Sequence, residues 1–406
     1  MHRLRTGRLL TTIALLTLIP LFPGCNAARK SRAHVQDPLM YELGVTIPVE
    51  TALDHSLARP ALDIWLEMIN GAKKTLDLGQ FYLCAQEGEP LDQVVEAVLA
   101  AHERGVRVRI LTDARMNRTY PELAQQFQSA GIPVRLFDWK KLTGGILHAK
   151  YMIVDDRSMY LGSQNFDWRS LKHIQETGIR LDSPVFAKAA ATIFEADWAY
   201  TGGDVDAYEK LKARSPVTFP GNARLLASPA AYNPPGVDGS LDHLVRILDG
   251  AQKRITIQLL SYSTHRYGSE ERFTTIDDAL RRAAGRGVEV EMIMSNWNKR
   301  HPEDLTALSA IPGIRIRFMN IPEATEGFIP FARVVHSKVV RVDEDLCWIS
   351  TSNWSYDYFY ASRNLEVLIQ DRTLAMQLNR LFTDLWNSPY EEEVTPDGTY
   401  TAPRRE

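Results

Sequence analysis

The stretch that decides the fold lies at residues 146–155, where the chain reads Ile146-Leu147-His148-Ala149-Lys150-Tyr151-Met152-Ile153-Val154-Asp155. Its apolar residues indicate a strand, and side chains two positions apart on a strand point to the same face. His148 and Lys150 therefore share one face, with Leu147 and Ala149 packed beneath them. The pattern predicts a nucleophile and a cation side by side.

The same pattern returns in the second half of the chain, as Val335-His336-Ser337-Lys338-Val339-Val340-Arg341-Val342-Asp343. An asparagine follows each histidine at an identical spacing, at Asn165 and Asn353. A glutamate comes next at a nearly equal spacing, at Glu176 and Glu366. A lone His-x-Lys is usually a solvated strand face, but two ordered sets in diverged halves predict catalysis.

Other segments repeat in the same order. Residues 70–74 recur at 249–253, residues 103–108 at 285–290, and Phe194 with Trp198 at Phe382 with Trp386. Helices alternate with strands in both copies, which predicts an α/β fold of two duplicated α-β-α sandwich halves with the active site at their interface. We expect the halves at 46–205 and 226–392, a linker at 25–45, a connecting segment at 206–225 and a flexible tail at 393–406.

Composition narrows the class of protein. The chain has 406 residues, of which 45% are hydrophobic and 24% charged, and this excludes a disordered, collagenous or disulfide-stapled chain. The 47 basic residues nearly balance the 50 acidic ones, giving a net charge of −3. No bulk positive field draws this chain to nucleic acid or anionic lipid, so any anion site must be local.

The repeated residues suit the displacement of a phosphodiester. Such a reaction needs a nucleophile, charges on the non-bridging oxygens and an acid for the leaving oxygen. We assign these needs to His148, His336, Lys150, Lys338, Asn165 and Asn353, with Glu176 and Glu366 orienting the histidines and Asp155 and Asp343 capping turns. A histidine metal site is disfavoured because the lysines repel a cation, and no cofactor is expected.

The two HxKxxxxD strands with their downstream asparagines resemble the signature pair of the phospholipase D superfamily. The resemblance implies a phosphohistidine intermediate on one histidine, proton donation by the other, and a clamp of lysines and asparagines around the phosphate. In many relatives the first-half histidine is the nucleophile, which favours His148. The acids of the motif are the structural residues Asp155 and Asp343.

Further motifs resemble the branch that contains the mammalian phospholipases D three and four. They are Lys141-Leu142-Thr143-Gly144-Gly145, Asp167-Trp168-Arg169-Ser170-Leu171, Thr351-Ser352-Asn353-Trp354-Ser355 and Ser388-Pro389-Tyr390. This resemblance implies 5′ exonuclease action on single-stranded DNA and RNA, or lipid transphosphatidylation. Ser350-Thr351 departs from the usual Gly-Ser or Gly-Thr, which leaves the substrate open.

The sequence leaves three alternatives open: a nucleic-acid substrate, a phospholipid substrate, and an inactive protein. Aromatic residues near the motifs suit the stacking of unpaired bases, and they suit acyl chains equally, while core packing between the halves is expected to account for more than half of them: Phe166, Trp168, Trp354, Tyr356, Tyr358, Phe359 and Tyr360. Flanking basic residues could follow a nucleic-acid backbone: Lys140, Lys141, Arg169, Lys172 and Arg333. We favour single-stranded nucleic acid ends as the substrate. The alternative is phospholipid hydrolysis or headgroup exchange. A catalytically inactive envelope scaffold is the third.

The first 24 residues have the pattern of a secretory signal. Three arginines precede an apolar run from Leu9 to Phe22, and Gly24-Cys25 resembles the lipidation site of bacterial lipoproteins. We expect a periplasm-facing lipoprotein of a bacterial envelope acylated on Cys25, or otherwise a soluble periplasmic or secreted protein. Cys84 and Cys347 are predicted to be buried thiols, with a disulfide between them as the alternative. The oligomeric state stays open.

Overall fold

The computed structural model describes residues 39–266 and 268–406, which belong to one compact unit, Pro38–Glu406. The expected signal, the lipidation site at Cys25 and most of the expected linker lie outside the described residues. None of the helices in the described ranges is long and apolar enough to span a membrane.

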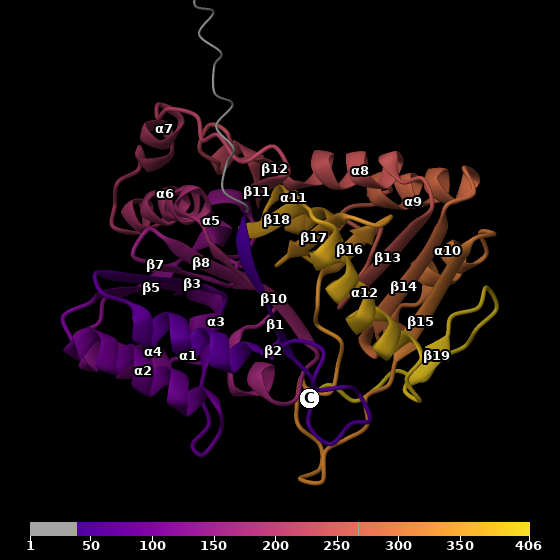
Figure 1. Ribbon diagram of the computed structural model, residues 1–406, viewed down its shortest axis with the longest axis horizontal. Coiled ribbons are helices and arrows are strands. Elements are labelled where there is room, and N and C mark those ends of the chain that lie inside the picture. Colours follow the sequence, from indigo (N-terminus) through magenta and orange to yellow (C-terminus); the bar gives the residue numbers. More distant parts are fainter. Residues whose placement is uncertain (1–38, 267) are drawn as a thin grey trace, which may run out of the picture. The chain divides into compact units, whose positions relative to one another are not determined.

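The first half builds one large sheet with helices on both faces (Figure 1), and the short strands β4 and β9 form a separate two-stranded sheet. Its elements are β1 (Met40–Thr46), β2 (Arg59–Pro60), α1 (Ala61–Gly71), β3 (Thr75–Gln80), β4 (Leu83–Cys84), α2 (Leu91–Glu103), β5 (Arg107–Asp113), α3 (Ala114–Asn117), α4 (Glu122–Ser129), β6 (Val134–Phe137), α5 (Trp139–Thr143), β7 (Tyr151–Val154), β8 (Ser158–Gly162), β9 (Phe166–Asp167), the 3-10 helix η1 (Trp168–Leu171), β10 (Glu176–Asp182) and α6 (Pro184–Thr201).

The second half repeats this plan after α7 (Ala207–Lys212). Its elements are β11 (Ala223–Ser228), η2 (Ala230–Tyr232), β12 (Asp238–Gly239), α8 (Ser240–Gly250), β13 (Arg254–Leu259), α9 (Thr275–Gly285), β14 (Glu289–Ser295), η3 (Asn296–Arg300), α10 (Glu303–Ser309), β15 (Ile314–Met319), β16 (Val339–Val342), β17 (Leu346–Ser350), α11 (Tyr356–Tyr360), β18 (Asn364–Gln370), α12 (Arg372–Trp386) and β19 (Glu391–Glu393).

The strand orders of the two sheets confirm the duplication. The first sheet runs β2-β1-β10-β8-β7-β3-β5-β6, and the second runs β12-β11-β18-β17-β16-β13-β14-β15-β19. Every strand of the first sheet has a counterpart at the same place in the second, with β19 added at one edge. The expected α/β fold of two duplicated halves is therefore present.

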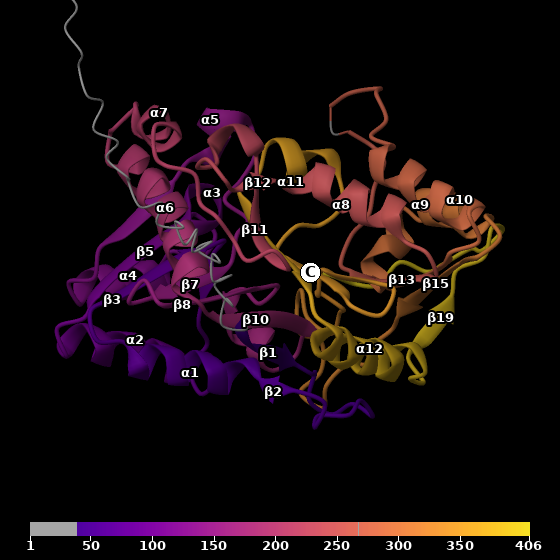
Figure 2. The same cartoon turned by 45° about the horizontal axis from the view of Figure 1, so that its top comes forward.

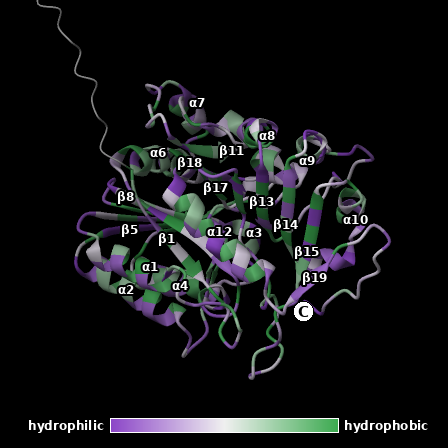
Figure 3. Cartoon of the chain, turned by 45° about the vertical axis from the view of Figure 1, so that its right-hand side comes forward, coloured by the Kyte–Doolittle hydropathy of each residue, from purple (hydrophilic) through white to green (hydrophobic). Residues whose placement is uncertain are grey.

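One hydrophobic core joins the halves. It unites the inner faces of both sheets with α6 and α12, while separate cores hold α1, α2 and α4 against the first sheet and α8, α9 and α10 against the second. Hydrophobic residues, green in Figure 3, are interspersed with hydrophilic ones along β13 and β14. Burial of two sheet faces against each other fixes the halves as one body.

Several expected boundaries need correction. β1 pairs with β10 along its whole length, so residues 40–45 belong to the first half rather than to a linker. β11 begins at Ala223, inside the expected connecting segment, which also contains α7. The expected flexible tail is packed: β19 pairs with β15, Val394 is buried, and the Tyr400 ring lies 5.0 Å from the ring of Phe318.

Candidate active site

His148 and Lys150 lie just before β7, and His336 and Lys338 just before β16, rather than within the expected strands. These two segments meet the opposite half. Leu147 forms a β-bridge with Arg363, just before β18, and Val335 forms one with Gln175, just before β10. The residue before each histidine therefore pairs with the other half. The backbone nitrogen of His148 donates to Arg363 O at 2.9 Å, and that of His336 donates to Gln175 O at 2.8 Å. These matched bonds place both imidazoles at the interface.

The backbones approach closely at this junction. A Cβ at Gly145 would lie 2.3 Å from the carbonyl oxygen of Ala361, which no larger residue could accept without displacing the backbone. The halves are also joined by a buried ion pair in which Arg363 Nη2 lies 2.9 Å from Asp197 Oδ1, both side chains being fully enclosed. The position of His148 is therefore fixed by rigid contacts.

A cavity of about 850 Å³ opens between the halves, and both histidines line it together with Asn165 and Asn353. The Oδ1 atoms of the two asparagines are buried without hydrogen-bond partners in the described part of the chain. Both imidazoles therefore line one cavity between the halves, where the sequence predicts the active site.

Each imidazole is held by an acceptor from a fixed position of β10 or β18. His336 Nδ1 lies 2.8 Å from Glu176 Oε2, and His148 Nδ1 lies 3.0 Å from Asn364 Oδ1. Glu176 and Asn364 follow the histidine of their own half at an identical spacing, and each binds the histidine of the other half. The acceptor pairs thus cross between the halves.

The expected role of Glu366 behind a histidine is wrong. In β18 it faces Ser350 of β17 and accepts hydrogen bonds from Ser240 at 2.5 Å and from Ser352. Its structural counterpart in the first half is Gly178, since Gly178 pairs with Gly162 as Glu366 pairs with Ser350. Asn364 and Glu176 follow the histidine of their own half at the same spacing, and this spacing could have identified Asn364 from the sequence. An uncharged amide is a less obvious partner for a histidine than a carboxylate.

The Asn364 amide fixes the tautomer of His148. Its Nδ2 donates to Tyr358 O at 2.9 Å, and its Oδ1 accepts from Thr351 Oγ1 at 3.0 Å. Because the amide oxygen faces the ring, His148 Nδ1 must carry the hydrogen, and Nε2 keeps its lone pair. A carboxylate can only accept, so His336 has the same tautomer when neutral.

The lysines lie buried beside the histidines. Lys150 and Lys338 are 2% and 1% exposed, and each ammonium donates to the carbonyl oxygen of the histidine two residues before it. Burial lowers the pKa of Lys338 to about 7 and that of Lys150 well below its usual range, the latter helped by the neighbouring Lys338. A bound anion would compensate these charges.

The two histidines are electrostatically unequal. Burial lowers the pKa of His336 to about 4 although Glu176 opposes the shift, whereas burial together with Lys150 and Lys338 lowers the pKa of His148 well below its usual range. Burial pushes the pKa of Glu176 upward, but the charges of His336 and Lys338 outweigh it and leave that pKa low. Glu176 is therefore ionised behind His336, while a neutral amide stands behind His148.

The motif acids hold turns, as the sequence predicts. The Asp155 carboxylate accepts from the backbone nitrogens of Lys73, Lys74 and Thr75 at 2.7 to 2.9 Å. Asp343 accepts in the same way from residues 252–254 at 2.7 to 3.0 Å. These bonds explain why the segments at 70–74 and 249–253 repeat along with the motifs.

The cavity wall differs from the aromatic set expected near the motifs. Trp354, Phe359 and Phe166 are buried in the cores, and only Tyr358 of the expected set lines the cavity. The other aromatic rings of the wall come from segments far apart in the sequence, namely from loops and, for Trp297, from η3: Phe81, Tyr82, Tyr120, Tyr262, Trp297 and Phe331. Tyr82 and Tyr120 are stacked with ring centres 5.3 Å apart.

Few of the expected basic residues face the cavity. Arg169 lines it, but Asp167 pairs with its guanidinium at 2.6 Å. Arg333 is buried and donates to Val49 O at 2.8 Å, and Lys172 pairs with Glu89 at 3.0 Å. Cys84 and Cys347 are free thiols, so the disulfide alternative is wrong. Cys347 is buried as expected, whereas Cys84 is half-buried.

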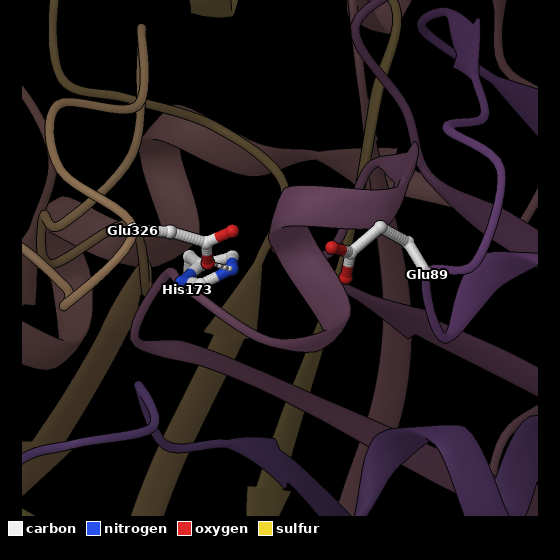
Figure 4. A group of neighbouring side chains, drawn as sticks. All are labelled: Glu89, His173 and Glu326. Carbon is white, nitrogen blue, oxygen red and sulfur yellow. Dashed lines mark ion pairs between the residues drawn. The ribbon is translucent and has the colours of Figure 1, made fainter.

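One group of potential metal ligands occurs among the described residues, formed by Glu89, His173 and Glu326 (Figure 4). His173 Nε2 lies 2.9 Å from Glu326 Oε1, and this pair joins the segment after η1 to the loop before the second motif. Lys172 already supplies a positive charge, 3.0 Å from Glu89 and 3.6 Å from Glu326. The group is separate from the histidines of the cavity. Burial lowers the pKa of His173 to about 4, so the ion pair that connects the halves here is the one between Lys172 and Glu326.

Known proteins resemble this chain over most of its length. A family model described as "Cardiolipin synthase, PLD-like domain" matches residues 65–198 and 244–386. Phospholipase D Z of Dictyostelium discoideum is 32% identical over 388 residues, covering 87% of this chain and 90% of that protein. The 5'-3' exonuclease PLD3 of Rattus norvegicus is 32% identical over 372 residues, covering 81% and 75%.

Solved structures share the architecture. A phosphatidylserine synthase of Haemophilus influenzae superimposes with a TM-score of 0.60 at 14% identity, covering 82% of this chain and 85% of that one. At this identity the likeness shows the fold alone.

Proposed function

The chain belongs to the phospholipase D superfamily, and we propose that it is a phosphodiesterase that forms a phosphohistidine intermediate and acts on the ends of single-stranded nucleic acids. One observation carries the chemistry. Two imidazoles from the two halves line a single cavity, and an acceptor from the opposite half engages the Nδ1 of each. Each ring therefore keeps Nε2 for reaction.

The difference between the acceptors assigns the two roles. The nucleophile must be unprotonated before it attacks, and a ring backed by a neutral amide gains least from protonation, which suits His148. The acid must hold a proton, and the carboxylate of Glu176 stabilises that proton on His336. His148 is the nucleophile in this scheme, and His336 is the acid and later the base.

The reaction proceeds in two displacements. His148 Nε2 attacks phosphorus, the bond to the leaving oxygen breaks, and His336 donates its proton to that oxygen. Water then attacks phosphorus while His336 removes a proton from it, and the phosphorus–nitrogen bond breaks. This releases the phosphate product and restores both rings. If an alcohol takes the place of water in the second displacement, the phosphoryl group is transferred to that alcohol instead of being hydrolysed.

The clamp for the phosphate comes from the chain itself. Asn165 and Asn353 line the cavity beside the histidines. Burial lowers the pKa values of Lys150 and Lys338, and a bound phosphate anion favours the charged form of both ammonium groups. Charges held in a buried site stabilise the developing charge strongly, because no solvent must reorganise around them. We therefore expect the activity to need no added metal.

The wall of the cavity favours nucleic acid as the substrate. The stacked Tyr82 and Tyr120, with Phe81 and Tyr358 packed against His148 at ring-centre distances of 4.9 Å, offer faces for unpaired bases. A relative at 32% identity is named a 5'-3' exonuclease. Phospholipid hydrolysis or headgroup exchange is the second candidate, supported by a relative of equal identity named phospholipase D Z.

A labelled oligonucleotide with a 5′ hydroxyl group tests the proposal against vesicles of phosphatidylglycerol or cardiolipin. Stepwise release from the 5′ end is expected, and its rate should fall steeply with salt because binding neutralises phosphates. Intact oligonucleotide beside turned-over lipid would refute the nuclease proposal. His148→Ala and His336→Ala should each abolish turnover. Activity that survives both substitutions would come from a contaminant, and the chain would then be the inactive scaffold.

The location of the enzyme is a further part of the proposal. The signal-like first 24 residues and Gly24-Cys25 support a lipoprotein of a bacterial envelope that faces the periplasm. Mass spectrometry of the mature amino terminus is expected to find diacylglycerol on Cys25. A free amino terminus elsewhere would favour a soluble periplasmic or secreted protein.

A further inference from the structure

The segment after β19 supplies a cation to the cavity. Arg405 lines the cavity together with Trp297 and Phe331. The Phe331 backbone nitrogen donates to Arg405 O at 3.0 Å, and the Arg405 guanidinium carbon lies 4.4 Å from the centre of a Trp297 ring. Figures 1 and 2 both place this end of the chain where the two halves meet. The guanidinium is thus held at the wall by backbone and ring contacts.

Arg405 has no ion-pair partner among the residues that the structure describes. Within residues 39–266 and 268–406, its Nε is buried without a hydrogen-bond partner. The other arginine of the wall, Arg169, is paired with Asp167 at 2.6 Å. A half-buried cation without an acceptor is costly, so a ligand anion is its natural partner.

The catalytic phosphate already has its own cations. Lys150 and Lys338 lie beside the histidines, and each ammonium donates to the carbonyl oxygen of the histidine two residues before it. The Lys150 ammonium also lies 4.8 Å from the centre of the Phe81 ring. Arg405 instead packs against Trp297 and Phe331, which belong to η3 and to the loop before the second motif. A cavity of about 850 Å³ has room for more than one phosphate group.

We propose that Arg405 binds a second phosphate of the substrate, the one next to the scissile phosphodiester in a single-stranded nucleic acid. The inference rests on the proposed function and makes the site selective for polyanionic chains over phospholipids with a single phosphodiester. The fork of a guanidinium matches two oxygens of one phosphate, and stacking on Trp297 keeps the fork in place.

The test compares Arg405→Gln with the wild-type chain on three substrates. They are a 5′-hydroxyl trinucleotide, the same trinucleotide with a neutral methylphosphonate beside the scissile linkage, and bis(p-nitrophenyl) phosphate. Losing a charged hydrogen bond should lower kcat/KM for the first about tenfold or more, and leave the other two unchanged. The methylphosphonate should cost the wild-type chain the same factor. The methylphosphonate replaces the linkage on the 3′ side of the scissile one, which is the only other linkage of this trinucleotide.

Two variants serve as controls. Arg404→Gln changes the neighbouring arginine, which packs on Phe328 and does not line the cavity, so it should act as wild type. Arg405→Lys keeps the charge but not the fork, and should recover part of the loss. Equal losses on all three substrates, or none, would overturn the second-phosphate site. Turnover of bis(p-nitrophenyl) phosphate with no trinucleotide cleaved would overturn the proposed nuclease function and this inference with it.

Discussion

Replacing Glu176 with glutamine tests which histidine donates the proton. Glutamine keeps the shape and can still accept from His336 Nδ1, where the carboxylate oxygen now lies 2.8 Å away. Only the charge is lost, so the His336 pair comes to resemble the His148–Asn364 pair. The variant should therefore fold normally while holding the His336 proton less tightly.

The size of the effect follows from the bond. A buried hydrogen bond to a charged group contributes about 1.5–3 kcal/mol and a neutral one about 0.5–1.5, so the change costs the protonated ring about 1–1.5 kcal/mol. This equals about one pKa unit at about 1.36 kcal/mol per unit. The pKa of His336, already lowered to about 4, falls further. Because the acid must be protonated, kcat/KM falls about tenfold at every pH above that pKa.

The assay uses two leaving groups from pH 4 to pH 8. A dinucleotide releases a basic alkoxide that needs the proton, so Glu176→Gln should lose about tenfold in kcat/KM. The first burst of p-nitrophenol from bis(p-nitrophenyl) phosphate needs no acid and should be nearly unchanged. Glu366→Gln is the matched control, since Glu366 hydrogen-bonds serines and no histidine. A Glu176→Gln burst slowed as strongly as dinucleotide cleavage would refute this assignment of roles.

Three other predictions concern metals and stability. Activity should survive millimolar EDTA in a direct turnover assay, and restoration by added Zn²⁺ or Ca²⁺ after its loss would contradict the metal-free clamp. Arg363→Ala strands the buried Asp197 carboxylate and should lower the free energy of unfolding by about 3–5 kcal/mol in urea titration. Burial raises the pKa of Glu366 from 4.5 to about 7, so the folded chain binds this proton more tightly than the unfolded chain. The free energy of unfolding should therefore fall by up to about 3 kcal/mol as the pH rises from about 4.5 to about 7. Glu366→Gln should therefore gain melting temperature over wild type at pH 8 but not at pH 4.

Local repetition predicted the fold and the central residues. The two HxKxxxxD segments lead into the counterpart strands β7 and β16 and so locate the sheets around them. The acceptors behind the rings are harder to predict, because the pairs cross between halves: Glu176 binds His336, and Asn364 binds His148. A charged residue two positions beyond Asn364 is the more obvious candidate, and only strand register shows that Glu366 faces the serines of the neighbouring strand and loop instead.

The wall of the cavity follows no local pattern, yet its sources obey one rule. Phe81 follows β3, Ser261 follows β13 and Trp297 follows β14, all strands that run parallel to a neighbour. Loops after the carboxyl ends of parallel strands gather at one edge of a sheet, where ligands bind. The contribution of Arg405 escapes even this rule, because it depends on packing of the final segment against η3.

The hydrogen-bond acceptors that cross between the halves make the two duplicated histidines chemically different. If both halves carried a glutamate at the position of Glu176, the two rings would have equal partners, and nothing in the protein would separate nucleophile from acid. With Asn364 in one place and Glu176 in the other, two identical groups on matching strands acquire different proton affinities. Each histidine takes its partner from the other half, so the division of labour exists only when the halves are joined. The bonds from His148 to Arg363 O and from His336 to Gln175 O therefore maintain the chemistry as well as the fold.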